Sequence, residues 1–239
     1  MGLKVGMMHI AKLFLSIIIV LILAVVIKKS KSLDNAGIAG STIMGFLLLY
    51  FCGIGYFLLL LSFFILGVLV SRAGLEKKKA KKIDETRRGL RNVIANGLIP
   101  LIFAILTIFG FSFGLVGFVS AIAAATSDTF SSELGVLSNE KPKLITTFET
   151  VEKGTDGAIT LFGTLAGLFG AFLIGLIAFL LFGDIKLVVC GTIGGIMGNL
   201  ADSLVGAVFE RKGILNNEHV NLIATIVGGI VGIAIYIVV

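Results

Sequence analysis

Long, uninterrupted apolar runs are the feature of this 239-residue sequence that most restricts its fold. Hydrophobic residues make up 57% of the chain and charged residues 14%, which leaves too little polar surface for a water-soluble domain of this size. In lipid the backbone must satisfy its own hydrogen bonds, so a chain forms either helices or a closed barrel. The runs are continuous rather than alternating, which favours helices. We therefore expect an all-α, polytopic membrane helix bundle.

The number of spans follows from the length of the runs, because a spanning helix needs about 20 mostly apolar residues. We predict eight spanning helices, at residues 8–27, 36–51, 54–71, 93–109, 111–128, 158–182, 187–208 and 221–239. The second is short and follows Asp34 and Asn35, so a half-span or re-entrant segment is the alternative there, and seven is the alternative count. Residues 1–239 are interpreted as a single integral-membrane domain, with 72–92 as a basic cytoplasmic loop or helical extension.

The distribution of charge predicts which connections share a side of the membrane. Basic residues lie in four segments, 28–31, 72–91, 141–153 and 211–212, apart from Lys4, Lys12 and Lys186. With eight spans these segments all fall on one side, which the positive-inside rule places in the cytoplasm. Every acidic residue except Asp184 falls on that side as well. This convergence suggests a cytoplasmic site for a polyanion together with a cation, in an integral protein of the cell membrane.

Carboxylates within two apolar segments are the strongest candidates for a functional site, because ionisable residues inside a span are costly. Asp128 and Glu133 lie in the segment TSDTFSSELG, and Asp202 lies in GNLADSLVGAVFE. Mg²⁺ prefers oxygen ligands and is commonly held by one or two carboxylates plus substrate phosphates. We predict that these three carboxylates are the catalytic and metal-binding groups; an interhelical hydrogen bond or a helix cap is the alternative for each.

Small residues precede both Asp128-Thr129 and Asp202-Ser203, which hints at an internal duplication. Arginine binds phosphate oxygens bidentately, so the basic cluster that leads into the fourth span could bind either a substrate phosphate or lipid headgroups. A helix start near Thr155 and Asp156 fits either a cap or an anion site. The candidate nucleotide- and phosphate-binding residues are Arg87, Arg88, Arg91, Asn92, Ser131, Ser132, Lys143, Thr155, Asp156, Asn199 and Ser203.

Several motifs resemble an integral-membrane family that contains the plant phytyl-phosphate kinase of vitamin E salvage and an uncharacterised animal transmembrane protein. They are TRRGLRNVIANG, SDTFSSELG, KPKLITT, EKGTDGAITLFGTLAG and GNLADSLVGA, followed by NNEHVN. The resemblance implies a kinase that converts an isoprenyl monophosphate into the diphosphate, with Mg²⁺ and a nucleoside triphosphate, CTP or another, as donor. The sequence departs from the family pattern at Glu210, in NNEHVN and in the VEK that precedes Gly154.

Two other classes of function remain in competition with a kinase. An ion-coupled transporter would use Asp128 and Asp202 as cation ligands in broken helices. A transferase that forms a CDP-lipid is the second alternative, although the sequence lacks a D-x-x-D-G-x-x-A-R pattern. The expected partners are the lipid phosphate, the nucleotide and membrane lipids, with no nucleic acid. A homodimer, the prenyl chain length and the donor base are left open by the sequence.

Overall fold

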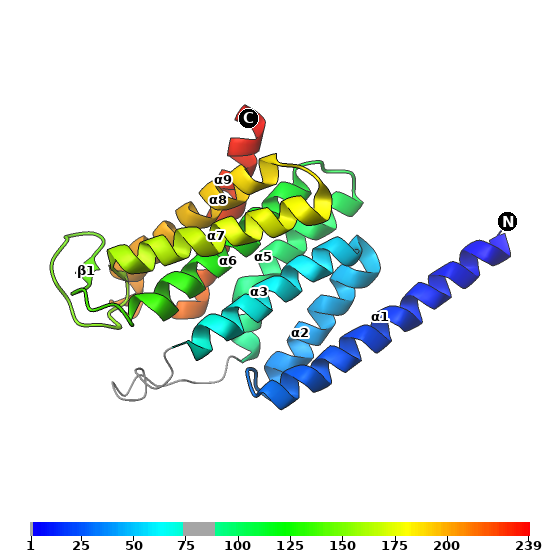
Figure 1. Cartoon of the computed structure of the whole chain (residues 1–239), viewed down its shortest axis with the longest axis horizontal. Coiled ribbons are helices and arrows are strands. Elements are labelled where there is room, and N and C mark those ends of the chain that lie inside the picture. Colours follow the sequence, from blue (N-terminus) through cyan, green and yellow to red (C-terminus); the bar gives the residue numbers. More distant parts are fainter. Residues whose placement is uncertain (1, 74–88) are drawn as a thin grey trace.

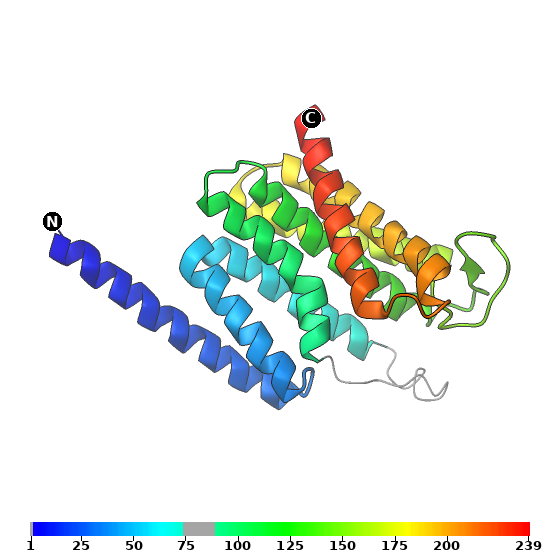
Figure 2. The same ribbon diagram turned by 180° about the vertical axis from the view of Figure 1, so that it is seen from behind.

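The computed structural model describes residues 2–73 and 89–239. Within these ranges the chain forms a bundle of long helices (Figures 1 and 2). Most of the basic segment 72–92, including Arg87 and Arg88, lies outside the described residues. The elements are α1 (Gly2–Ser30), α2 (Asn35–Leu47), the π-helical turn η1 (Leu48–Cys52), α3 (Ile54–Arg72), α5 (Leu90–Ile108), α6 (Gly114–Gly135), β1 (Lys143–Leu144), β2 (Ala158–Ile159), α7 (Leu161–Phe182), α8 (Lys186–Val205), the π-helical turn η2 (Gly206–Glu210) and α9 (Asn217–Val238).

This membrane helix bundle is the predicted fold class. Seven of the helical segments in the described ranges are long and apolar enough to cross a membrane. The eighth long helix, α6, is not one of the seven, yet it lies at the centre of the bundle, where α3, α5, α7, α8 and α9 pack around it. The helices run in alternating directions, so the connections α1–α2, α6–α7 and η2–α9 lie at the end opposite the two chain termini (Figure 1).

The boundaries confirm the second predicted span and correct two details of the prediction. The segment Asn35–Cys52 is long and apolar enough to span, as predicted for residues 36–51, and Asp34 caps its start: the Asp34 carboxylate accepts a hydrogen bond from the Gly37 N–H at 2.6 Å. Helix α6 continues seven residues beyond Asp128, to Gly135. Helix α7 begins at Leu161, since residues 158–159 pair with β1 and Thr160 is the helix cap.

Small residues let α6, α8 and α9 approach one another closely, which is the usual way that membrane helices associate. A Cβ added to Gly195 of α8 would lie 3.0 Å from the Ala123 Cβ of α6. One added to Gly198 would lie 2.7 Å from the carbonyl oxygen of Ala224 in α9. These distances leave no room for a side chain, so glycine at these positions sets the spacing between the three helices.

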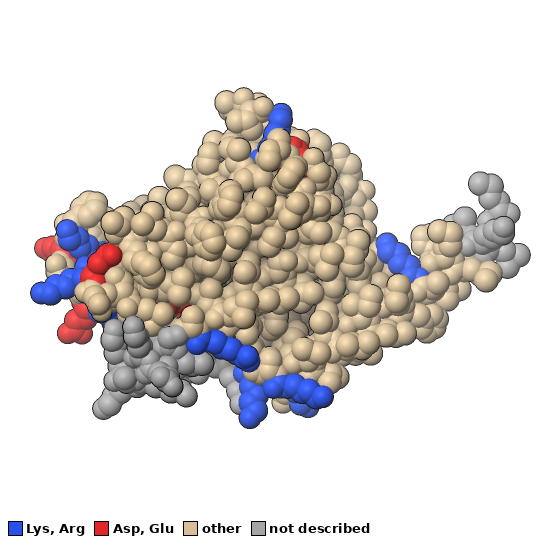
Figure 3. Space-filling view, in the orientation of Figure 1, with Lys and Arg blue, Asp and Glu red and all other residues tan. Residues whose placement is uncertain are grey.

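Helix α1 differs from this core, because it packs against α2 and η1 at the edge of the bundle and exposes most of its apolar side chains (Figure 1). Figure 3 shows a broad uncharged surface across the body of the molecule, with basic and acidic side chains concentrated at its lower and left ends. An apolar belt between polar ends is the surface expected of a protein embedded in a bilayer.

Replacing Gly198 with alanine tests the close packing. The new methyl group would press against Ala124 and the Ala224 carbonyl, so Gly198→Ala should destabilise the bundle by about 1–3 kcal/mol. The measurement is the free energy of unfolding, or the Tm, in detergent. Met197→Ala is the control, because this neighbouring side chain is 42% exposed and faces outward. Equal effects of the two substitutions would contradict the assigned spacing.

Candidate functional site: a carboxylate-lined cleft at one end of the bundle

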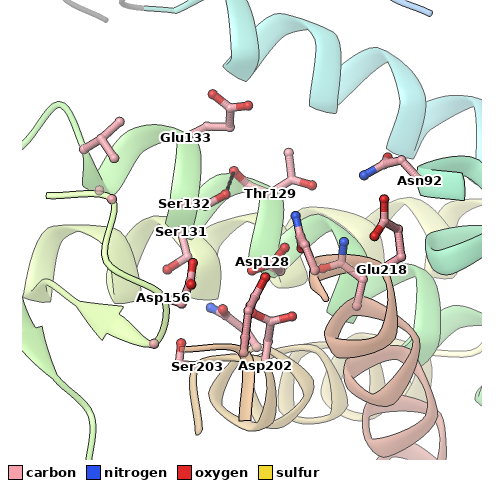
Figure 4. A pocket seen from close by; sticks show the side chains of 18 of the residues that line it. Asn92, Asp128, Thr129, Ser131, Ser132, Glu133, Asp156, Asp202, Ser203 and Glu218 are labelled. Carbon is pink, nitrogen blue, oxygen red and sulfur yellow. Dashed lines mark hydrogen bonds between the residues drawn. The ribbon is translucent and has the colours of Figure 1, made fainter. Parts of the chain in front are cut away.

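A polar cleft of about 840 Å³ opens at the bundle end where the charged loops gather. Its walls come from α5, α6, α8 and α9, together with the start of α2 and the loop that joins α6 to α7. Figure 4 shows several of the polar side chains that line it. Of the residues predicted from the sequence, the cleft lining includes Arg91, Asn92, Asp128, Ser131, Ser132, Glu133, Thr155, Asp156, Asn199, Asp202 and Ser203.

Asp128 and Asp202 lie next to each other on facing helices, although 74 positions separate them in the sequence (Figure 4). Asp128 is half-buried on α6 and Asp202 half-buried on α8. The Oδ2 atom of Asp202 is inaccessible to solvent and has no hydrogen-bond partner among the described residues. Its electrostatic neighbours are Asp128, Glu210 and Asp156, all of them carboxylates. A buried carboxylate oxygen in such surroundings is costly unless a cation or a proton neutralises the charge.

Glu133 does not join this pair, which corrects the prediction of three clustered carboxylates. It lies five residues after Asp128 on α6, so it faces a different direction. Its Oε1 atom accepts a hydrogen bond from the Ser71 hydroxyl of α3 at 2.9 Å, and Figure 4 shows it pointing away from Asp128. Glu133 therefore lines the rim of the cleft and connects α3 to α6.

Two carboxylates are enough for the expected metal. No group of three His, Cys, Asp or Glu residues converges into a metal site within the described ranges. Mg²⁺, however, usually keeps several waters and takes one or two protein carboxylates together with substrate phosphates. The unpartnered Asp202 oxygen beside Asp128 fits such a partly open site. The donor set is all oxygen, which disfavours the softer metals that prefer sulfur or imidazole.

Hydroxyl groups near the carboxylates divide into two kinds. Thr129 donates to the Ala125 carbonyl at 2.8 Å and Ser132 donates to the Thr129 carbonyl at 3.2 Å, so both already serve α6. Ser131 and Ser203 line the cleft from α6 and α8, on either side of Asp156 in Figure 4. Asn199, one turn before Asp202 on α8, is buried. Ser131 and Ser203 are thus the better-placed hydroxyls for a ligand.

The loop 136–160 covers one side of the cleft and is held in place by a glycine. Gly157 has a positive φ of 73°, and a Cβ there would lie 2.5 Å from the Ser203 carbonyl oxygen. The Gly157 carbonyl accepts a hydrogen bond from the Ile145 N–H at 3.1 Å, which ties this turn to β1. Close backbone contact with α8 and η2 thereby places Thr155 and Asp156 at the cleft.

The start of α7 is not the anion site that the sequence left open. Its N–H groups are already occupied: the Thr160 hydroxyl accepts from Gly163 at 3.0 Å, and the Glu140 carboxylate accepts from Leu161 at 2.9 Å. Thr155 and Asp156 precede β2 and cap no helix. Lys143, in β1, is exposed and is not part of the cleft lining, whereas Lys153 is. The Lys153 ammonium donates to the carbonyls of Val136 and Ser138 within the loop.

The start of α5 opens onto the cleft, as do the starts of α2 and α9. Its N-cap is Gly89, which makes no side-chain cap, and Gly89, Leu90 and Arg91 all line the cleft. The helix dipole favours an anion at such a position, and a Cβ on Gly89 would lie 2.9 Å from the Asp34 carboxylate. Asn92 and Asn96 continue the same face, with the Asn96 amide donating to the Asn92 carbonyl at 3.1 Å. Arg91, Asn92 and Asn96 all line the cleft and therefore lie on one side of α5.

Sequence reasoning missed part of the cleft. Asp34 lines it from the cap of α2, while Asn217, Glu218 and Asn221 line it from the first turns of α9. Asn221 is buried, although it lies in a segment that reads as a polar helix start. The signal was present in NNEHVN, where Asn217 and Asn221 are four residues apart and therefore share a helix face.

The fold and cleft define an integral membrane protein with a polar site at one end of its helix bundle. The family model described as "Integral membrane protein DUF92" matches residues 18–229, so the chain belongs to that family. It is 77% identical over 225 residues to an uncharacterised membrane protein of Methanocaldococcus jannaschii, covering 94% of each chain.

Two plant proteins from Arabidopsis thaliana are also similar. The protein "VTE6, chloroplastic" is 36% identical over 84% of this chain and 64% of its own length, and "Protein PGR" is 32% identical over 84% of this chain and 80% of its own. No solved structure matches. The family match confirms the resemblance that the sequence motifs indicated.

Asp202→Asn tests the cation site without any assay of activity. Divalent metal that binds the folded protein at about 100 times its Kd should raise the free energy of unfolding by about 2.7 kcal/mol. The measurement is the Tm in detergent with MgCl₂ or MnCl₂ and with EDTA. Asp202→Asn should abolish the metal-dependent increase and raise the Tm in EDTA, because it replaces a buried carboxyl group that faces other carboxylates with a neutral amide. Glu133→Gln should keep the increase; its loss in that variant would return Glu133 to the site.

Gly157→Ala should detach the loop from α8. Trypsin cleavage after Lys153, located by mass spectrometry, should become faster as the loop loses its contact with Ser203 and Ala207. Gly154→Ala is the matched control, since Gly154 also has a positive φ, 87°, but a Cβ there meets no atom within 4 Å. Equal acceleration in both variants would mean that the strain of alanine at a positive φ, and not the loss of the close contact with α8, loosens the loop.

Proposed function

We propose that this protein is a prenyl-phosphate kinase, which transfers the terminal phosphoryl group of a nucleoside triphosphate to an isoprenyl monophosphate. CTP is the proposed donor and a phytyl- or geranylgeranyl-type monophosphate the proposed acceptor. Two lines of evidence support this proposal: membership of the DUF92 family, in which the motifs resemble those of the plant phytyl-phosphate kinase, and the chemistry of the cleft. The observation that carries it is the facing pair Asp128 and Asp202, with a buried carboxylate oxygen that lacks a protein partner.

The acceptor phosphate has a suitable place at the start of α5. Arg91 supplies a guanidinium group, and the dipole of α5 favours an anion at its start. Asn92 follows on the same face and offers an amide donor. The Asp34 and Glu218 carboxylates line the same part of the cleft, with Glu218 beside Asn92 (Figure 4).

The donor nucleotide has a suitable place between α6, α8 and that loop. Ser131, Ser203 and Asn199 offer hydroxyl and amide groups beside the aspartates, and Thr155 lies on the loop that covers them. Asp128 and Asp202 would hold Mg²⁺ here, and the ion would neutralise negative charge on the transferred phosphoryl group. The protein groups position the two phosphates and exclude water from the space between them.

The reaction needs little covalent help from the protein. A phosphate oxygen of the acceptor forms a bond to the terminal phosphorus of the donor, while the bond from that phosphorus to the bridging oxygen breaks. The products are a prenyl diphosphate and a nucleoside diphosphate. The acceptor is already anionic, so no strong general base is required, and catalysis rests on orientation and charge stabilisation. A cleft rich in polar groups but without histidine suits this chemistry.

The position of the cleft favours a kinase over an ion-coupled transporter. Transporters bind substrate and ion near the middle of the bilayer, at broken helices. Here α6 continues unbroken through Asp128, and the cleft lies at the bundle end that carries the charged loops. The positive-inside rule assigns that end to the cytoplasm, where nucleoside triphosphates are available.

The direct test is product analysis with purified protein, geranylgeranyl monophosphate, MgCl₂ and CTP labelled at the γ-phosphate. Label should appear in the prenyl diphosphate. Asp128→Asn should lower kcat by about 100-fold or more, the size of effect seen when a charge-stabilising group is lost. Arg91→Lys should raise KM for the acceptor by about tenfold, because an ammonium cannot bind phosphate bidentately. Glu133→Gln should remain close to the wild type.

Other outcomes of the same assay separate the competing functions. A CDP-lipid as product would indicate a transferase instead of a kinase. No product from any isoprenyl monophosphate with CTP, ATP or GTP would contradict the proposal. Sealed right-side-out vesicles should be inactive with external CTP until they are permeabilised; activity before permeabilisation would place the cleft on the outer face.

A further inference from the structure

A second cavity lies beside the polar cleft and has the opposite character. It is an apolar chamber of about 100 Å³ between α1, α2, α3 and α5. Its lining is mostly aliphatic and aromatic and includes Val20, Leu23, Ala24, Phe57, Leu61 and Phe64. Two residues, Asn92 and Asn96, line both the chamber and the polar cleft. The two spaces therefore adjoin along a single face of α5.

The order of groups along α5 runs from polar to apolar. Gly89 and Arg91 line the cleft alone, Asn92 and Asn96 line both spaces, and Val93 and Gly97 line the chamber alone. A molecule with a phosphate at the start of α5 would thus place whatever is attached to that phosphate in the chamber. The order of polar and then apolar residues along this face matches a ligand that has an anionic headgroup followed by a hydrocarbon chain.

The geometry points to this chamber as the binding site for the hydrocarbon tail of a lipid monophosphate whose phosphate occupies the cleft. The proposal rests on the kinase function proposed above. It assigns to the chamber the hydrocarbon part of the acceptor, which the polar cleft cannot hold. An apolar cavity of about 150 Å³ binds benzene, so one of about 100 Å³ accepts a fragment on the scale of a single five-carbon isoprene unit. The chamber thus holds the unit nearest the phosphate, and the remaining tail extends into lipid.

The position of α1 explains how the tail would leave the chamber. This helix packs against α2 and η1 and lies at the edge of the bundle, with Val25 and Val26 exposed outward on the same turn as Ala24. The chamber wall that α1 provides is therefore next to the surrounding lipid. A tail can pass out beside α1 without any polar group entering the hydrocarbon.

Small side chains set the width of the chamber. A Cβ at Gly45 of α2 would lie 3.3 Å from the Phe57 ring and 3.8 Å from Val20, both of which line the chamber. A Cβ at Gly97 of α5 would lie 2.6 Å from the Met44 methyl group. Ala24 lines the chamber from α1 with a single methyl group. A phenyl group at Ala24 would fill the chamber and leave the polar cleft untouched.

The test pairs Ala24→Phe with Val25→Phe, which adds the same ring on the same helix but toward lipid, where Val25 is 55% exposed. Binding is measured with a radiolabelled geranylgeranyl monophosphate that carries a diazirine in its first isoprene unit. Irradiation and mass spectrometry should locate crosslinks on chamber residues such as Leu23, Leu61 or Phe64. Ala24→Phe should raise the concentration needed for half-maximal crosslinking by about tenfold, which is 1.4 kcal/mol, and Val25→Phe should leave it unchanged.

This readout is independent of phosphoryl transfer, so it separates the failure of the two proposals. Crosslinks in the chamber without any diphosphate product would keep the tail site and reject the kinase. Crosslinks on the outer surface of α7, or equal effects of the two phenylalanine variants, would overturn the tail site whatever the activity. Labelling of the chamber by a photoreactive phosphatidylcholine that geranylgeranyl monophosphate fails to displace would also overturn it, because the occupant would then be a structural lipid.

Discussion

The close packing of α6 against α8 and α9 is the contact on which the rest of the structure depends. Glycine and alanine occupy the crossing points, so the backbones approach until a single added methyl group would collide with a neighbour. In lipid, this close fit replaces the hydrophobic driving force that would join helices in water. It also brings two aspartates from separate helices to the same depth. A wider spacing would separate Asp128 from Asp202 and remove the charge cluster that makes the cleft a site.

This central position explains why α6, alone among the eight long helices of the described residues, is not apolar enough to count as a candidate span. It is buried on nearly every side by other helices, so it needs little hydrophobicity of its own. The hydroxyls of Thr126, Thr129 and Ser132 bond back to carbonyls of α6 itself, as Thr126 does to Ile122 at 2.8 Å. A helix shielded from lipid can carry Asp128, Ser131 and Glu133 on its final two turns, whereas a lipid-facing helix such as α1 could not.

The polar cleft and the apolar chamber divide the bundle by chemical character. The C-terminal helices α6, α8 and α9 form the rigid part that holds the aspartates, and the N-terminal helices α1, α2 and α3 enclose the chamber. Helix α5 belongs to both, since its first turns line the cleft and its next turns line the chamber. A kinase acting on a lipid phosphate needs this combination, because its substrate has one end in water and the other in the bilayer.

The sequence by itself determined the fold class, the approximate spans and eleven of the residues that line the cleft. Hydropathy follows the free energy of transferring each side chain into lipid. A carboxylate in an apolar run can therefore be recognised from the sequence without knowledge of its neighbours in space. The tertiary structure alone decided which of these groups meet. It paired Asp128 with Asp202 and turned Glu133 toward Ser71, because five residues along a helix change the facing direction. It added Asp34 and Asn221 to the cleft, left Lys143 outside it, and made Thr160 the cap of α7. Such contacts depend on the rotation and spacing of distant helices, which packing sets and local sequence does not.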